Sequence, residues 1–184
     1  AAAAAFSTGM AAISSTLLSL LKQGDRVVSI RDSYGGTNVL FEEFLPRYGI
    51  AVTLCETTDC DAIEAQIAAG CQVVYLETPT NPTLKVVDIA RLCAAARAVG
   101  AVTVTDNTFA TPVNQRPAQL GSDLVLHSAT KFLSGHSDVL AGVVSGGHEL
   151  VRRIHHFREI AGATLSPEGA YAVLRGMKTL GLRM

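Results

Sequence analysis

Short apolar runs alternate along this chain with longer segments that have the periodicity of amphipathic helices. Strands that alternate with helices of about a dozen residues indicate repeated β–α–β units, whose crossovers are right-handed and whose strands are parallel. The expected strands are almost continuously apolar, which is typical of a sheet that helices cover on both faces. We therefore expect an α/β fold of three layers, with a mostly parallel sheet flanked by helices.

Helix and strand boundaries follow from apolar periodicity, capping residues and turn residues. We expect helices at Met10–Gln23, Thr37–Tyr48, Asp59–Ala69, Val87–Val99, His148–Ile160 and Pro167–Leu180. We expect strands at Arg26–Ile30, Ile50–Cys55, Gln72–Glu77, Ala101–Asp106, Asp123–His127 and Val139–Ser145. Ser7 or Thr8 is a candidate N-cap for the first helix, because a hydroxyl there accepts from free helix N–H groups.

The composition excludes several classes of protein. The 184 residues correspond to about one domain, and 48% hydrophobic residues with a net charge of −1 exclude a disordered chain. Fifteen basic and sixteen acidic residues provide no basic surface for a nucleic acid or an anionic membrane. No apolar run reaches the roughly 20 residues of a membrane span. The four cysteines form no Cys-x-x-Cys pair, so we expect a reduced, cytoplasmic protein.

Polar and ionisable side chains follow three of the expected strands. Glu77 ends one strand, Asp106 ends the next, and His127 to Lys131 follow the third. Because ligands of open α/β sheets bind beyond the carboxyl ends of the strands, we expect these groups to converge at one edge. Asp106 could also be an ordinary turn residue. The alternative is a buried carboxylate that pairs with one specific cation.

Lys131 and its neighbours supply the rest of a candidate site. Lysine forms imines with carbonyl compounds, and removal from water lowers its pKa into a useful range. The hydroxyls of Ser128 and Thr130 could satisfy backbone groups of a turn. They could also bind phosphate together with the first helix, whose N-terminus follows Ser7 and Gly9. An imine-forming lysine, an acid for a pyridinium nitrogen and a phosphate cup together match pyridoxal 5'-phosphate (PLP).

Several blocks of the chain resemble the trans-sulfuration (Cys/Met metabolism) family of PLP-dependent enzymes. They are residues 7–12, 32–37, 77–82, 106–112, 128–138 and 174–180, in the family's order. The family includes cystathionine synthases and lyases, methionine γ-lyase and O-acetylhomoserine sulfhydrylase. The resemblance covers essentially the whole chain, and it implies the large domain of the fold-type I, aspartate-aminotransferase-like PLP enzymes.

The resemblance also implies roles for single residues. Lys131 would bind the cofactor covalently as a Schiff base and shuttle protons, Asp106 would keep the pyridine nitrogen protonated, and Tyr34 would stack on the ring and act in acid–base steps. The remaining cofactor-binding residues implied are Ser7, Gly9, Met10, Glu77, Asn81, Thr108, Ser128 and Thr130. Gly9 and Met10 would offer backbone N–H groups to the phosphate, and Asn81 would lie near the 3'-oxygen of the ring.

The chain differs from the family in length. Family members are about twice as long and carry an upstream segment and a smaller downstream domain, which supply phosphate and substrate-carboxylate ligands. We therefore expect residues 1–184 to be the PLP-binding large domain alone. Position 36 is Gly36, where some methionine γ-lyases have cysteine. An oligomer is expected as well, because family sites are built from two subunits.

The resulting prediction is a PLP-dependent carbon–sulfur lyase that acts on a sulfur-containing amino acid of the cysteine, cystathionine or methionine type, by β- or γ-elimination. The alternatives are a γ-replacement synthase that uses the same residues, or a lyase domain or non-catalytic fragment of a larger multidomain protein. We expect no metal site, because His155 and His156 are adjacent on one helix and point about 100° apart.

Overall fold

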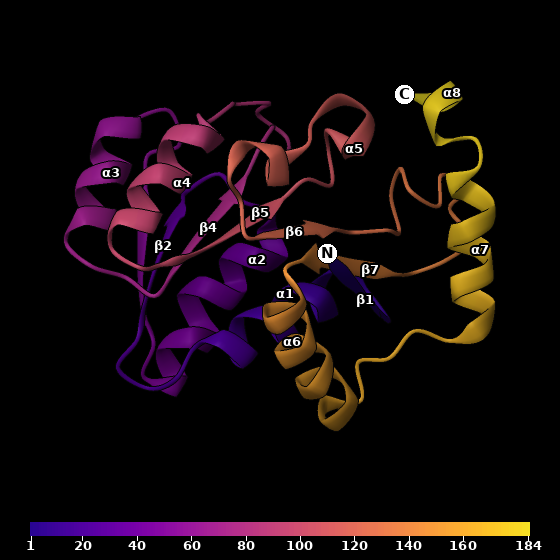
Figure 1. The fold of residues 1–184 in the computed structure, drawn as a ribbon, viewed down its shortest axis with the longest axis horizontal. Helices are drawn as coiled ribbons and strands as arrows, with labels where there is room; N and C mark the ends of the chain where they lie inside the picture. Colours follow the sequence, from indigo (N-terminus) through magenta and orange to yellow (C-terminus); the bar gives the residue numbers. More distant parts are fainter.

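The computed structural model describes residues 1–184 as a seven-stranded sheet between two layers of helices (Figure 1). The strand order is β1-β7-β6-β5-β4-β2-β3. The strands are β1 (Ala2–Phe6), β2 (Arg26–Ile30), β3 (Ala51–Cys55), β4 (Val73–Glu77), β5 (Val102–Asp106), β6 (Leu124–His127) and β7 (Gly142–Gly146). All pairings among β2 to β6 are parallel, whereas β7 and β1 pair antiparallel. The predicted mostly parallel sheet is confirmed.

The helices occupy most of the predicted segments. The α-helices are α1 (Gly9–Leu20), α2 (Gly35–Val39), α3 (Cys60–Ala68), α4 (Ile89–Ala98), α5 (Thr111–Asn114), α6 (His148–Ala161), α7 (Pro167–Met177) and α8 (Leu180–Arg183). Three short turns of other helix types are η1 (Leu40–Phe44), η2 (Leu45–Tyr48) and η3 (Pro117–Leu120). Thr8, Asp59 and Asp88 cap α1, α3 and α4 by accepting hydrogen bonds from backbone N–H groups.

Two apolar cores lie on opposite faces of the sheet. The larger core packs Ala12 and Leu17 of α1 and Ile154 of α6 against side chains such as Val73 and Tyr75 of β4. The second core packs α3 and α4 against the side chains that point the other way along the same strands, through Ile63, Leu92, Val28, Val74 and Leu76. Alternation along β4 therefore buries both faces of the sheet, as its continuous apolar character predicted.

Two expectations from local pattern need correction, and one strand was missed. The helix expected at Thr37–Tyr48 divides into α2, a π-helical turn and a 3-10 turn, and Pro46, which has no N–H to donate, lies in the last. The helix expected at Pro167–Leu180 ends at Met177, and α8 follows it. Strand β1 was not predicted, because an alanine run has little strand propensity and its pairing with β7 joins distant parts of the chain.

The parallel strands bring the candidate residues to one edge of the sheet. Glu77 and Asp106 are partners in register at the ends of β4 and β5, and Asp106 lies opposite Leu126 of β6. His127 ends β6, so the segment that carries Ser128 and Lys131 leaves the sheet beside Asp106. No helix is long and apolar enough to cross a membrane.

Candidate active site

Asp106 is a buried carboxylate with three hydrogen-bond donors and no cation. The residue is buried, with 6% of its surface exposed. Oδ1 accepts from the backbone N–H of Thr108 at 3.0 Å and from its hydroxyl at 2.5 Å, and Oδ2 accepts from the Tyr75 hydroxyl at 3.3 Å. Burial raises the pKa of Asp106, and these hydrogen bonds partly offset the rise. The site therefore holds a carboxylate that favours a cationic partner.

Glu77 lies next to Asp106 and joins two loops. Oε2 accepts from the backbone N–H of Tyr34 at 2.8 Å, and Oε1 accepts from that of Asn81 at 3.3 Å. Burial and the neighbouring Asp106 carboxylate raise the pKa of Glu77 to about 7. This single side chain fixes the backbone of both segments for which the sequence predicts contacts with the cofactor ring.

Tyr34 is about half exposed, at 47% of its surface. Gly36 makes this position possible, because a Cβ atom there would lie 2.9 Å from Cε1 of Tyr34 and 3.1 Å from Sδ of Met10. Tyr34 and Met10 therefore converge on Gly36. A side chain larger than hydrogen at position 36 would displace one of them.

The N-terminus of α1 lies against Ser128. The Thr8 hydroxyl accepts from the backbone N–H of Ala11 at 2.9 Å, which identifies Thr8 as the N-cap rather than Ser7. A Cβ atom at Gly9 would lie only 2.7 Å from Cβ and Oγ of Ser128, so glycine permits this approach. The Ser128 backbone N–H donates to the Thr108 hydroxyl at 2.7 Å. Thr108 thus connects the candidate phosphate residues to Asp106.

Lys131 lies in the segment after β6, and its side chain is exposed. Its backbone N–H donates to the Ser128 carbonyl at 3.1 Å, while its ammonium group makes no hydrogen bond or ion pair. The expectation that Lys131 is withdrawn from water is not met in this chain alone. Thr130 has its hydroxyl committed to Ala141, donating to its carbonyl at 3.2 Å and accepting from its N–H at 3.0 Å. A contact between Thr130 and phosphate stays a prediction.

These features fit a PLP molecule. Two buried, adjacent carboxylates have no cationic side chain, and a protonated pyridine nitrogen would supply the missing positive charge at Asp106. The close approach of Gly9 to Ser128 brings the start of α1 and the Ser128 hydroxyl together, which suits a phosphate there. Lys131 has a free amine in the turn that follows β6, the strand next to Asp106. Donors, charges and amine therefore match the three parts of the cofactor.

Sequence reasoning missed Tyr75 and Lys85. Tyr75 reaches Asp106 from inside the larger core, where it also meets the Phe41 ring edge-on at 5.3 Å. Nothing in a buried strand marks one tyrosine as a hydrogen-bond donor to a later strand. Lys85 joins the segment after β4 to Asp32 at 2.8 Å and to Glu56 at 3.0 Å. Asp32 precedes the Tyr34 turn, so this pair ties the two loops together a second time.

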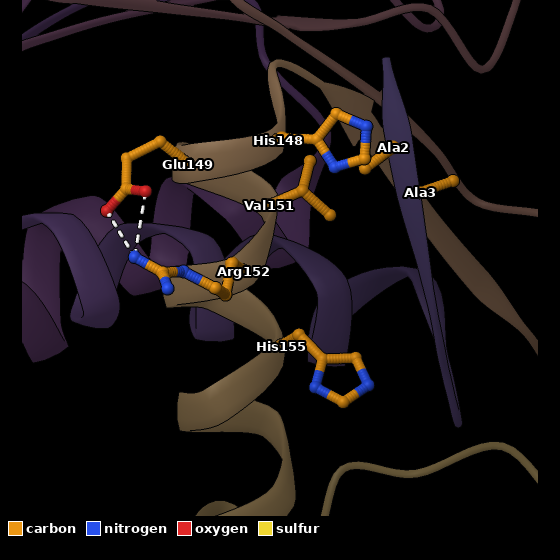
Figure 2. A pocket seen from close by; sticks show the side chains of 7 residues that line it. All are labelled: Ala2, Ala3, His148, Glu149, Val151, Arg152 and His155. Atoms are coloured by element: carbon orange, nitrogen blue, oxygen red, sulfur yellow. Dashed lines mark hydrogen bonds and ion pairs between the residues drawn. The ribbon is translucent and has the colours of Figure 1, made fainter.

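A shallow hollow of about 440 Å³ lies elsewhere, between β1 and α6. Figure 2 shows His148 and His155 extending from α6 on the side of Ala2 and Ala3 of β1, whereas Arg152 points away from β1 and pairs with Glu149. At this place β1 begins and β7 ends, beside Leu124, the first residue of β6. The hollow therefore lies away from the strand ends that carry Glu77 and Asp106. No group of three or more His, Cys, Asp or Glu side chains could hold a metal ion.

A three-layer α/β domain with a lysine after one parallel strand and a buried carboxylate on the next defines a PLP-dependent enzyme of fold type I. The family model described as "Cys/Met metabolism PLP-dependent enzyme" matches residues 1–184, and the chain belongs to that family. The predicted family, fold and cofactor are thereby confirmed.

Named relatives match the whole chain. L-methionine gamma-lyase from Fusobacterium nucleatum subsp. polymorphum is 46% identical over an alignment of 186 positions, which covers 100% of this chain and 47% of that protein. Cystathionine beta-lyase from Bacillus subtilis is 48% identical over 98% of this chain and 46% of its own length. The crystal structure of cystathionine gamma-lyase from Lactobacillus plantarum complexed with L-serine superimposes with a TM-score of 0.95 at 43% identity, over 100% of this chain and 48% of that one. The chain thus spans about half the length of the relatives it matches.

Proposed function

We propose that this chain is the PLP-binding part of a carbon–sulfur lyase that acts on a sulfur-containing amino acid by β- or γ-elimination. The observation that carries the proposal is the buried Asp106 carboxylate, which has no cationic partner, on the strand next to the one that leads to Lys131. The names of relatives support the substrate class, because lyases for cystathionine and for methionine match the whole chain at 44–48% identity.

The residues that would hold the cofactor come from four segments. Asp106 would accept a hydrogen bond from the protonated ring nitrogen, and Tyr34 would lie against the ring. The phosphate would meet the N–H groups of Gly9 and Met10 and the Ser128 hydroxyl, where the dipole of the twelve-residue helix α1 favours an anion. We propose Ser7, Glu77, Asn81, Thr108 and Thr130 as the surrounding residues that shape this site.

Bound PLP supplies an aldehyde that bonds to amines and a ring that withdraws electrons from the substrate's α-carbon. The Lys131 amine would hold that aldehyde and, once displaced by the substrate amine, would take the α-proton at Nζ. Its exposed side chain, whose amine makes no hydrogen bond or ion pair, is compatible with both tasks. Asp106 would keep the ring nitrogen protonated throughout, because its buried carboxylate is stabilised by a facing positive charge. Tyr34 would move a proton at the substrate, and the exposure of its side chain supports this role.

The reaction is balanced without an oxidant. Elimination breaks one C–S bond, releases a thiol, and after addition of water yields a 2-oxo acid and ammonia. The test is incubation of purified PLP-loaded protein with L-cysteine, L-cystathionine and L-methionine. Equimolar thiol, 2-oxo acid and ammonia from one of them is the expected result. The absence of all three products with every substrate would contradict the proposal.

Replacement of an activated γ-substituent by a thiol is the second candidate. A protein named probable cystathionine gamma-synthase, from Herpetosiphon aurantiacus, is 43% identical over 97% of this chain, so this activity has a relative of comparable similarity. Incubation with an O-acylhomoserine and a thiol distinguishes the two activities. A thioether as the sole product would favour the synthase and exclude the lyase.

We propose further that residues 1–184 form the PLP-binding large domain of a homo-oligomeric, cytoplasmic enzyme. The match of this chain to about half of each relative supports the domain assignment. Four free cysteines suit a reducing compartment. Light scattering of the PLP-loaded protein tests the oligomer, and a monomer that retains full activity would contradict it. A lyase domain within a multidomain protein remains the alternative, which the mass of the native protein distinguishes.

A further inference from the structure

We propose that Arg183 and Arg175 are positioning residues for Lys131, and that they act by fixing the loop of residues 132–138 (the lysine loop) to the helices α7 and α8. The proposal rests on the proposed function of Lys131. It assigns to the last helices of the chain a task at the active site.

Arg183 binds the lysine loop directly. Its Nη1 donates to the carbonyl oxygen of Phe132, the residue after Lys131, at 2.7 Å. Its Nη2 donates to the Gly176 carbonyl at 2.7 Å, and Nε donates to the Thr179 hydroxyl at 3.1 Å. One guanidinium group therefore connects the end of α7, the start of α8 and the peptide that follows Lys131. A planar fork of donors suits three acceptors in fixed directions.

A second contact closes the other end of the lysine loop. Arg175 of α7 forms an ion pair and a hydrogen bond with Asp138. The Arg175 guanidinium lowers the pKa of the Asp138 carboxyl, as a bonded cation does. Between the two arginines, the backbone of Gly176 meets the backbone of Ser134 so closely that a Cβ atom at position 176 would overlap the Ser134 carbonyl oxygen.

An apolar cluster lies beneath these polar contacts. Ala129, Leu133 and Ala141, all near the lysine loop, pack with Val173 of α7 and Leu180 of α8. Figure 1 shows α7 and α8 at the end of the molecule opposite α3, beyond the edge of the sheet formed by β1 and β7. In this buried cluster, the residues that pack against α7 and α8 come from the segment that carries Lys131 and from Ala141, which precedes β7. None of them belongs to the two main cores.

The position of Lys131 depends on its backbone, because its ammonium group makes no contact of its own. The Lys131 N–H donates to Ser128, and its carbonyl oxygen accepts from the N–H of Gly135 at 2.8 Å and from the Ser134 hydroxyl at 3.3 Å. These bonds form one turn, and Arg183 binds the next carbonyl along it. Loss of Arg183 would thus free the turn that aims the lysine.

Hydrogen exchange of the cofactor-free protein tests the structural half of the proposal. In Arg183→Gln we expect the N–H groups of Lys131, Ser134 and Gly135 to exchange about tenfold faster, since hydrogen bonds from a charged donor are lost. Amides of β5 should be unchanged. Arg153→Gln is the matched control, because Arg153 also donates to a distant carbonyl, that of Leu20 at 3.5 Å. Unchanged exchange in the lysine loop of Arg183→Gln would overturn the proposal.

Covalent capture of PLP tests the functional half. Borohydride fixes PLP that is bound to a lysine, and the rate at which Lys131 becomes fixed reports how well its amine is positioned. We expect capture to be about tenfold slower in Arg183→Gln and intermediate in Arg183→Lys, which keeps the charge but loses the fork. An equal rate in wild type and Arg183→Gln would overturn the proposal. No adduct even in wild type would instead refute the proposed function of Lys131, and the positioning role with it.

A charge exchange separates positioning from general destabilisation. Asp138→Arg should slow capture, and the double variant Asp138→Arg with Arg175→Asp should recover most of the rate, because the ion pair is rebuilt with its ends reversed. Melting temperatures are recorded in parallel for all variants. If the double variant recovers the melting temperature but not the capture rate, the contact only stabilises the fold and Arg175 has no positioning role.

Discussion

Glu77 and Asp106 end neighbouring parallel strands as direct partners in register, and neither carboxylate forms an ion pair. Both side chains are 6% exposed. Two adjacent buried anions raise the free energy of the folded chain unless a proton or a cationic ligand compensates them. The stability of the cofactor-free protein should therefore depend on the protonation of this pair, and a ligand that binds beside the pair should carry a positive charge.

Removal of the Glu77 charge should change how stability depends on pH. The folded-state pKa of Glu77 is raised from 4.5 to about 7, so its contribution is fully present below pH 4.5 and is lost as pH rises through 7. The free energy of unfolding of Glu77→Gln minus that of wild type should therefore increase between pH 4.5 and 7, by at most roughly 3 kcal/mol. Urea denaturation of the cofactor-free proteins at several pH values measures it.

The comparison with wild type is needed because His127 contributes to the pH dependence of stability with the opposite sign to Glu77. Burial lowers the pKa of His127 from 6.5 to about 4, so stability is lost as pH falls through that interval. The difference between Glu77→Gln and wild type cancels this contribution. A difference that does not vary between pH 4.5 and 7 would show that Glu77 is not the group with the raised pKa.

Tyr75→Phe should remove one hydrogen bond to the Asp106 carboxylate while preserving the packing of the core. The ring stays against Phe41, but the hydroxyl that donates to Oδ2 of Asp106 is lost. We expect a loss of about 1–2 kcal/mol in stability and several-fold weaker PLP binding, because the carboxylate loses a buried donor. Urea denaturation and cofactor titration measure the two effects. Tyr48→Phe, at a tyrosine that is 59% exposed, is the control; equal behaviour of the two variants would argue against the role of Tyr75.

Thr108→Val should remove the hydroxyl that links Ser128, a candidate phosphate residue, to Asp106. The Thr108 hydroxyl donates to Oδ1 of Asp106 and accepts from the Ser128 N–H, so its loss leaves that N–H without an acceptor and removes one of the three donors to Asp106. We expect a cost of about 2–4 kcal/mol in stability, from about 1–3 kcal/mol for the unpaired Ser128 N–H and about 1 kcal/mol for the hydrogen bond lost at Asp106. Thr108→Ser keeps the hydroxyl and should behave nearly as wild type in chemical denaturation. Equal losses in both variants would assign the effect to packing of the methyl group.

Gly9→Ala should close the approach between α1 and Ser128. The added Cβ would lie 2.7 Å from two Ser128 atoms, which requires the helix or the loop to move. Overpacking of this kind costs about 1–3 kcal/mol, and we expect phosphate-dependent affinity for PLP to fall more than affinity for pyridoxal. Gly147→Ala is the matched control, because nothing lies within 4 Å of its added Cβ. Equal loss of both affinities would place the phosphate elsewhere.

Much of the fold and the site could be predicted because local sequence carries it. Continuous apolar strands and capping residues such as Asp59 and Asp88 mark the elements. Asp106 ends one strand, and Lys131 lies shortly after the end of the next. The features that were missed depend on distant pairing. Strand β1 exists through its pairing with β7, and Tyr75 meets Asp106 across adjacent strands. The exposure of Lys131 likewise depends on which distant segments pack around it, and the residues next to it in sequence do not reveal this.

The central claim is that Lys131 is the residue that binds PLP covalently. The most direct measurement is peptide mass spectrometry after incubation with PLP and reduction with borohydride. The account predicts one pyridoxyl adduct, on the peptide that contains Lys131, and its absence in Lys131→Ala while Lys22→Ala behaves as wild type. An adduct on another lysine, or none at all, would contradict the account.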